Sequence, residues 1–350
     1  MGDKISTQMS FADLMVSQRT RKSSFLDEVD GMVDWRPIEN ILNRNYKKKA
    51  SVDGRPPSPA LALFKMLLIQ RWYNLSDPGL EEAVNDRISF LRFTGFCMEN
   101  SIPDETTICR FRNELAKRDL FERLLDRINE QLQSRQLLVR TGTIVDAGLI
   151  SSSRRPRKVI DVMPEDRKEH ESAVLSNHKL TYSDDVEAAW VRKGNQPHYG
   201  YKMHMATDHA GFVLGGHVTA ANMSDTGEFI TILNGLDLQS DTVIVADKGY
   251  ASAKNRGYLQ DRGYTDGIMS RAARGRSLTE DEKARNRSIS KIRYVVEQTF
   301  GTLKRRYGLF RARYVGRLKT QGELLLCSIA FNLRKAATML SQREKCAHLA

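Results

Sequence analysis

The chain has 350 residues, 40% hydrophobic and 28% charged, which is enough apolar material for one large or two ordinary domains and excludes wholesale disorder. Its 55 basic and 43 acidic residues leave a net charge of +12, which favours a polyanionic partner, nucleic acid above all. Four scattered cysteines without a C-x-x-C pair argue against a zinc or disulfide scaffold and fit a reducing, cytoplasmic location.

Membrane association is not expected from the apolar runs. None approaches the roughly 20 residues that a membrane helix needs, and residues 1–10 lack the apolar core of a secretory signal. The longest run, Leu324 to Phe331, suits a buried segment.

The first part of the chain predicts a polar arm and then a small helical domain. Residues 1–55 are polar and carry a lysine cluster at 47–49, with one short helix expected from Trp35 to Leu42. Residues 56–139 follow a helical period. Four helices are expected there, one with an apolar stripe of Leu61, Phe64, Leu67, Leu68 and Trp72, one capped by Asp77 and running to Leu91, one capped by Asp104, and one from Leu120 to Leu137.

The third of these helices is basic. Arg110 and Arg112 are expected on its exposed side, where they would contact DNA, although an ordinary solvated face would have the same composition.

From Thr141 the pattern changes to short strands alternating with helices, which predicts an α/β domain over residues 140–340 and a tail at 341–350. An antiparallel hairpin is expected beside parallel strands in one mixed sheet. The expected strands are 143–147, 202–207, 212–219, 242–247 and 265–269, and the expected helices are 226–236, 253–262, 291–307 and 322–342.

Two carboxylates stand at the ends of apolar strands. Asp146 follows Thr143-Ile144-Val145, and Asp247 follows Val243 to Ala246. Ligands of open α/β sheets lie at the carboxyl ends of the strands, so both are candidate site residues. Either aspartate alone could equally cap a turn.

A third carboxylate, Glu297, borders the apolar face of the expected helix 291–307. It is flanked by Arg293 four residues before and Lys304 seven residues after, so all three lie within about 40° of one line down the helix. An ordinary Arg293–Glu297 ion pair, worth about 0.3–0.5 kcal/mol, would explain the spacing without any site.

If Asp146, Asp247 and Glu297 converge, their charges need a cation between them. Oxygen ligands select Mg²⁺ or Mn²⁺, and two such ions can activate a nucleophile and stabilise a leaving oxygen in phosphodiester displacement. The flanking Arg293 and Lys304 would hold DNA phosphates beside the ions. The segment 271–319 has 15 basic and four acidic residues, which fits a polyphosphate substrate.

At these residues the sequence resembles bacterial DDE transposases of the insertion-sequence-five family, over roughly residues 55–335. The strongest match is the block Arg293-x3-Glu297-x6-Lys304 that continues into Arg305-Arg306-Tyr307-Gly308 and Arg311-Ala312-Arg313-Tyr314. The other matching segments are 143–147, Ala246-Asp247-Lys248-Gly249-Tyr250, Lys193 to His204, Arg71 to Asp77 and Pro103 to Thr107.

The resemblance implies a ribonuclease-H-like core preceded by a helical DNA-binding or dimerisation domain. Asp146, Asp247 and Glu297 would be the catalytic triad and would hold two Mg²⁺ or Mn²⁺ ions. The enzyme would cleave double-stranded DNA at the inverted repeats of an insertion sequence and join the 3′-hydroxyl to target DNA, as a homodimer on that DNA.

The sequence departs from the family at two positions. Ser290 stands where a tyrosine is usual, and Tyr294 lies at a different helical angle, which puts a stacking or phosphate contact in doubt. Gly148, where a larger residue is common, is expected to loosen the end of the first strand.

Weaker candidates for DNA contact are Arg305, Lys202, His198 and His204, and the two histidines could equally be ordinary polar residues of a hairpin. Two alternatives to a transposase stay open: a metal-dependent nuclease that never joins strands, and a DNA-binding protein whose triad no longer acts.

Overall fold

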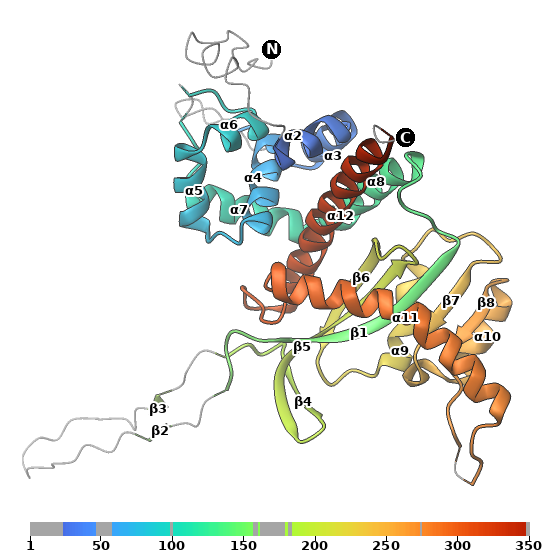
Figure 1. The fold of residues 1–350 in the computed structure, drawn as a ribbon. Helices are drawn as coiled ribbons and strands as arrows, with labels where there is room; N and C mark the ends of the chain where they lie inside the picture. The colour runs from blue at the N-terminus through green and yellow to red at the C-terminus, as the bar shows by residue number, and fades with distance from the viewer. Residues whose placement is uncertain are drawn as a thin grey trace, which may run out of the picture.

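The computed structural model describes residues 24–46, 58–98, 101–156, 160–161, 179–180, 184–273 and 275–347. Figure 1 shows a helical part and a sheet part joined by one long helix, α12. The helices are α2 (Phe25–Met32), α3 (Trp35–Asn45), α4 (Ala60–Trp72), α5 (Asp77–Asp86), α6 (Ile88–Thr94), α7 (Glu105–Lys117), α8 (Leu120–Ser134), α9 (Asp225–Asn234), α10 (Ala253–Asp261), α11 (Glu280–Arg306) and α12 (Arg317–Ala347), with a short 3₁₀ helix, η1, at Lys248–Tyr250.

Helix α4 is the centre of the helical part. Every residue from Ala60 to Trp72 is buried except Leu61, because α3, α5, α6, α7 and α12 surround it. The single apolar stripe predicted for this helix is therefore wrong. Buried polar residues such as Gln70 and Arg71 lie on its other sides.

The predicted second helix is two helices. The chain is extended at Arg87, which ends α5 and begins α6. The cap of α5 is Ser76, whose hydroxyl accepts a hydrogen bond from the Gly79 amide, and not Asp77 as predicted. The Asp77 carboxylate is therefore available for other partners.

Residues 24–46 are part of the helical domain, which corrects the arm predicted for 1–55. Helix α2 begins with a capping box between Ser24 and Asp27, and α3 buries Ile38 and Leu42 against the domain. The lysine cluster at 47–49 lies outside the described residues. At the other end, α12 continues to Ala347, so most of the predicted tail is helix.

The sheet is mixed, as predicted. Strands β1 and β7 are parallel, as are β7 and β8, whereas β5 pairs antiparallel with β1, β4 and β6. The strands are β1 (Gly142–Ser151), β4 (Ala189–Lys193), β5 (Gln196–Asp208), β6 (Val213–Ala220), β7 (Val243–Ala246) and β8 (Thr265–Ile268), and a separate two-stranded pair is formed by β2 (Ile160–Asp161) and β3 (Lys179–Leu180).

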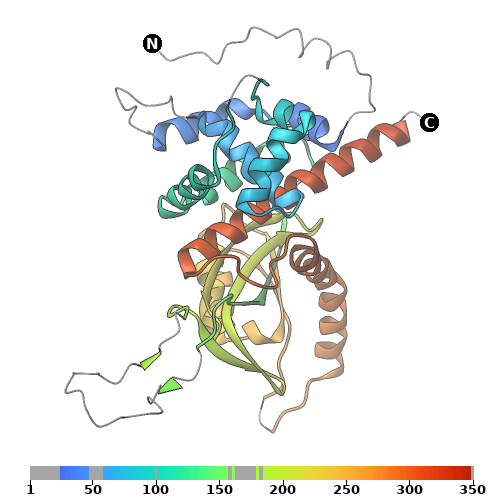
Figure 2. The same ribbon diagram turned by 90° about the vertical axis from the view of Figure 1, so that its left-hand side faces the viewer.

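Helix α11 covers one face of the sheet and α9 the other, as Figure 2 shows. A Cβ atom at Gly148 would lie 3.0 Å from both the Phe300 ring of α11 and the methyl carbon of Met203. The glycine thus lets the helix sit tightly on β1, and the prediction that it loosens the strand is wrong. Thr279 caps α11, so the helix starts eleven residues earlier than predicted.

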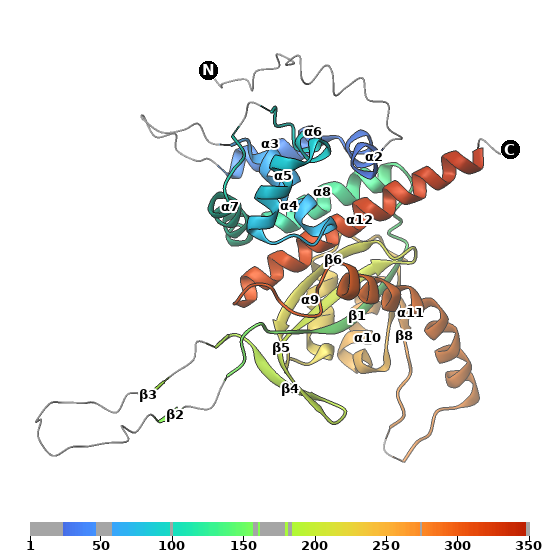
Figure 3. The ribbon, with the colours of Figure 1, turned by 60° about the vertical axis from the view of Figure 1, so that its left-hand side comes forward.

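Helix α12 lies between the helical part and the sheet (Figure 3). By length and composition alone, its segment Arg317–Arg343 could span a membrane, which was not expected from the sequence. However, 67% of the apolar 18-residue window within this segment is buried inside the protein. Its apolar residues therefore serve as core for both parts.

A buried ion pair connects the helical part to α12. The Arg71 guanidinium lies 2.8 Å from the Glu323 carboxylate, and neither side chain is exposed to solvent. Arg71 also donates to the Tyr314 hydroxyl, and Arg313 donates its amide to the second Glu323 oxygen. The matching segments Arg71–Asp77 and Arg311–Tyr314 thus meet at this interface.

Candidate active site

The two strand-end aspartates lie side by side. Strands β1 and β7 are in parallel register with Val145 opposite Ala246, so Asp146 and Asp247 are the next residues on neighbouring strands. Such strands are about 4.8 Å apart and opposed residues point to the same face. The charge of Asp247 contributes to raising the pKa of the Asp146 carboxyl, which burial raises most.

Local hydrogen bonds fix the turn that carries Asp247. Its carboxylate accepts the Gly249 amide at 2.8 Å and caps η1. A Cβ atom at Gly249 would come within 2.9 Å of that carboxylate oxygen, so glycine permits the contact. From neighbouring helices, Thr226 donates to the Gly249 carbonyl and Asn255 to the Tyr250 carbonyl. The turn is thereby anchored on both sides.

Helix α11 places Arg293 over Asp146. The Nη2 atom of Arg293 lies 3.0 Å from Oδ2 of Asp146, and the two side chains are 13% and 17% exposed. The second Asp146 oxygen accepts the Ala147 amide at 2.9 Å. Both contacts favour the ionised carboxylate and partly offset the effect of burial on its pKa.

Glu297 does not join the two aspartates. It is one helical turn beyond Arg293, about 6 Å along the axis, but its side chain is exposed. Among the described residues, no three histidine, cysteine, aspartate or glutamate side chains are grouped closely enough to hold a metal ion. The predicted convergence is therefore found for Asp146 and Asp247 and not for Glu297.

Lys304 lies near Asp146, and Lys193 lies near Lys304. Burial lowers the pKa of Lys304, nearby Lys193 lowers it further, and Asp146 raises it. Lys193 is at the end of β4, next to the turn of the β4–β5 hairpin, and was not among the predicted site residues. It lies 111 positions before Lys304, so no local pattern connects the two lysines. The only signal for Lys193 in the sequence is that the matching family segment begins there. Arg305, in contrast, is exposed and lines a pocket with Phe331 and Lys335 of α12.

Lys202 and His204 lie on the other face of the sheet. They pair with Leu149 and Ala147 of β1, whose side chains point to the face of the sheet opposite to that of Asp146. Lys202 lies 2.8 Å from the Asp225 carboxylate. His204 is fully buried, and burial lowers its pKa to about 3. The predicted DNA contact is therefore wrong for His204, whereas for Lys202 it stays a prediction.

The remaining β5 candidate, His198, is half-buried. His204 stacks on His217 and hydrogen-bonds the Thr219 hydroxyl, which accounts for a histidine in that position.

Arg112 is a structural residue. It is 5% exposed and donates two hydrogen bonds to Asp77, at 2.7 and 2.8 Å. Its guanidinium also lies over the Tyr314 ring. The predicted exposure of Arg112 is therefore wrong, whereas Arg110 is exposed as predicted. Because its side chain is buried, Arg112 is not available to contact DNA.

The departures from the family pattern on α11 are at its surface. Ser290 is exposed, and Tyr294 is 59% exposed.

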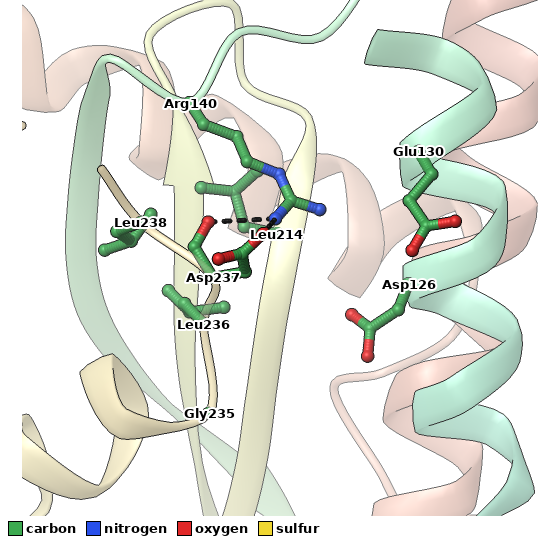
Figure 4. A pocket seen from close by; sticks show the side chains of 8 residues that line it. All are labelled: Asp126, Glu130, Arg140, Leu214, Gly235, Leu236, Asp237 and Leu238. Atoms are coloured by element: carbon green, nitrogen blue, oxygen red, sulfur yellow. Dashed lines mark hydrogen bonds and ion pairs between the residues drawn. The ribbon is translucent and has the colours of Figure 1, made fainter. Parts of the chain in front are cut away.

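A second acidic group lies at the opposite end of β1 (Figure 4). Asp126, Glu130, Arg140 and Asp237 line a pocket of about 160 Å³, in which Arg140 pairs with Asp237 at 3.2 Å. Burial, followed by the charge of Glu122, raises the pKa of Asp126 to about 6. This pocket is separate from Asp146 and Asp247.

The donors at the acidic pair fit a hard divalent cation. Both are carboxylates on adjacent strands, and such oxygen ligands suit Mg²⁺ or Mn²⁺ better than zinc or copper. Arg293 and Lys304 beside them fit a phosphate.

Comparisons with known families and proteins agree with this chemistry. Residues 138–333 match the family described as a transposase DDE domain, and residues 14–114 match a family described as a transposase domain. The transposase for insertion sequence element IS1106 of Neisseria meningitidis serogroup B is 40% identical over 235 residues, which are 66% of this chain and 78% of that protein.

Solved structures give fainter likenesses. A piggyBac transposase synaptic complex with hairpin DNA has a TM-score of 0.43 at 10% identity, covering 90% of this chain and 75% of that one. A Mos1 mariner paired-end complex with Mn has a TM-score of 0.20 at 10% identity, covering 83% and 91%.

Proposed function

The chain belongs to the transposase DDE family, whose members are enzymes that act on DNA, and from that premise we propose that it cleaves the ends of an insertion sequence and joins the freed 3′-hydroxyl to target DNA. The observation that carries the proposal is the register of β1 and β7, which sets Asp146 beside Asp247 at the strand ends. The cationic side chains of Arg293 and Lys304 border this pair.

In this proposal Asp146 and Asp247 hold divalent cations, two Mg²⁺ or Mn²⁺ ions in all. When bound, such ions would activate the attacking oxygen and stabilise the leaving one. Glu297 is proposed as the third ligand, because its backbone is one turn from Arg293 and a change of rotamer would turn its carboxylate toward the pair.

The cationic residues are proposed to hold DNA. Lys304 and Lys193 would bind the phosphates next to the acidic pair, and Arg293, Arg305, His198 and Arg110 would contact DNA around it. With six or more phosphate contacts, the logarithm of the binding constant should fall with a slope of about −5 or steeper against the logarithm of salt concentration.

The substrate would be double-stranded DNA with inverted repeats, bound in the bacterial cytoplasm by a homodimer that keeps two ends together. A place within the insertion-sequence-five family is part of the same proposal and is supported by the block from Arg293 to Lys304.

A joining assay tests the proposal. The protein is mixed with Mg²⁺, linear DNA that carries the element's inverted repeats with pre-cut 3′ ends, and a supercoiled target plasmid. We expect joined products, which disappear in Asp247→Asn while DNA binding persists. A parallel reaction contains uncut ends. Cleavage there without any joined product in either reaction would instead identify a nuclease, and binding without either reaction would identify an inactive DNA-binding protein.

A further inference from the structure

Tyr250 is a fully buried residue beside the acidic pair. It ends η1, the short helix that Asp247 caps, and its side chain is 1% exposed. Its ring packs on Phe229 of α9, with centroids 5.5 Å apart. Its ring is therefore held between α9 and the Asp247 turn.

That hydroxyl has no hydrogen-bond partner among the described residues. Burying a hydroxyl without a partner is costly, and protein interiors rarely contain one without a reason. Most of its electrostatic surroundings are acidic, because Asp146, Asp225 and Asp247 each add to the effect of burial in raising the Tyr250 pKa, and Arg293 opposes them. The group therefore stays protonated and able to donate.

The three neighbouring carboxylates differ in what they can still accept. Asp225 lies on the far face of the sheet, where its Oδ1 atom is 2.8 Å from the Lys202 ammonium but forms no hydrogen bond among the described residues, so it can still accept one, although it is not part of the proposed cation site. Asp146 has contacts on both oxygens. Asp247 has a partner among the described residues on one oxygen only, the Gly249 amide.

We propose that Tyr250 is a positioning residue for the acidic pair: its buried hydroxyl donates a hydrogen bond to the Asp247 carboxylate when that carboxylate binds a divalent cation, and so fixes which oxygen faces the ion. This inference rests on the proposed cation binding by Asp146 and Asp247. Hydrogen bonds from outside the ligand set orient metal-binding carboxylates, and losing one lowers metal affinity about 10–100-fold.

The test measures Mn²⁺ binding by the full-length protein without DNA, using the electron paramagnetic resonance signal of the free ion. Tyr250→Phe keeps the ring and its packing but removes the hydroxyl. The matched control is Tyr307→Phe, another buried tyrosine, whose hydroxyl lies 3.4 Å from the Ala330 carbonyl in the core. Urea unfolding of the metal-free proteins is measured in parallel.

We expect Tyr250→Phe to weaken Mn²⁺ binding about tenfold or more, with metal-free stability equal to or above that of the native protein, and Tyr307→Phe to bind Mn²⁺ normally. If the native protein binds Mn²⁺ and Tyr250→Phe binds it with the same affinity, the inference is overturned and the cation site stands. A loss of metal-free stability in Tyr250→Phe would show a purely structural hydroxyl and also overturn it. Absence of Mn²⁺ binding by the native protein would overturn the cation site and this inference together.

Discussion

Arg293 reaches from α11 to β1 and binds the Asp146 carboxylate at 3.0 Å, with both side chains largely shielded from solvent. Asp146 needs this neighbour because burial and the adjacent Asp247 both raise its pKa. The same guanidinium is one helical turn from Glu297. The position of α11 on the sheet therefore controls the charge balance of the whole acidic pair.

Replacing Arg293 by Gln should destabilise the protein in a pH-dependent way. Without the guanidinium the pKa of Asp146 rises further above its unfolded value, so ionisation costs folding free energy at pH 8 and costs much less at pH 4, where the carboxyl of the folded protein is protonated. We expect a loss of about 1–3 kcal/mol at pH 8, measured by urea unfolding. Lys291→Gln, at an exposed position on the same helix, is the control and should change neither value. An equal loss at both pH values would contradict the account.

Two arginines of α7 should behave in opposite ways. Arg110→Ala removes an exposed charge and should reduce the salt dependence of DNA binding, lowering the magnitude of the slope by about 1, with little effect on stability. Arg112→Ala breaks the buried pair with Asp77 and should cost about 3 kcal/mol of unfolding free energy. Urea unfolding and DNA titrations at several salt concentrations measure both. A stable Arg112→Ala protein that has lost DNA binding would refute the structural role given to Arg112.

The buried pair of Arg71 and Glu323 should dominate the stability of the interface between the helical part and α12. Glu323→Ala leaves a guanidinium buried without its carboxylate and should cost about 3–5 kcal/mol. The double variant Arg71→Met with Glu323→Leu should recover most of that loss, because apolar side chains of similar size need no charge partner. A double variant no more stable than Glu323→Ala would show that the pair is not the source of the effect.

Asp126 should make stability fall as pH rises from about 4 to 6. Its pKa is raised to about 6 in the folded protein, so between pH 4 and 6 the folded state holds the proton more tightly than the unfolded state does. Above pH 6 both states are ionised, and the buried charge lowers the free energy of unfolding. Asp126→Asn should flatten this part of the pH profile and stabilise the protein at pH 7.5 by about 1 kcal/mol after allowance for its partial exposure. Thermal unfolding from pH 4 to 8 measures the effect, and an unchanged profile would refute it.

The features that could be predicted from the sequence are those that depend on local residue patterns. The strands that end in Asp146 and Asp247 are short apolar runs, and the meeting of parallel strand ends follows from sheet geometry, so their pairing was foreseeable. The helical period also placed Arg293 and Glu297 on the same side of α11. The period does not determine the side-chain rotamer, however, and the Glu297 side chain is exposed to solvent.

Long-range partners account for the wrong predictions. Arg112 looked exposed because its partner, Asp77, lies 35 positions away and was expected to cap its own helix. His204 was a candidate for DNA contact, but it is fully buried in the β5–β6 hairpin, where its neighbours are His217 and Thr219 of β6. The Tyr250 hydroxyl, which has no partner within the described part of the chain, could not be predicted from the sequence, because its burial depends on the packing of α9 against the Asp247 turn.

The most direct test of the account is cleavage of DNA that carries the element's inverted repeats, with Mg²⁺, by the native protein and by Asp146→Asn and Asp247→Asn. Each substitution removes one carboxylate charge from the pair but keeps its size, so we expect cleavage to be lost and DNA affinity to be retained. Cleavage at the native rate by either variant would contradict the assignment of these two aspartates as the catalytic centre.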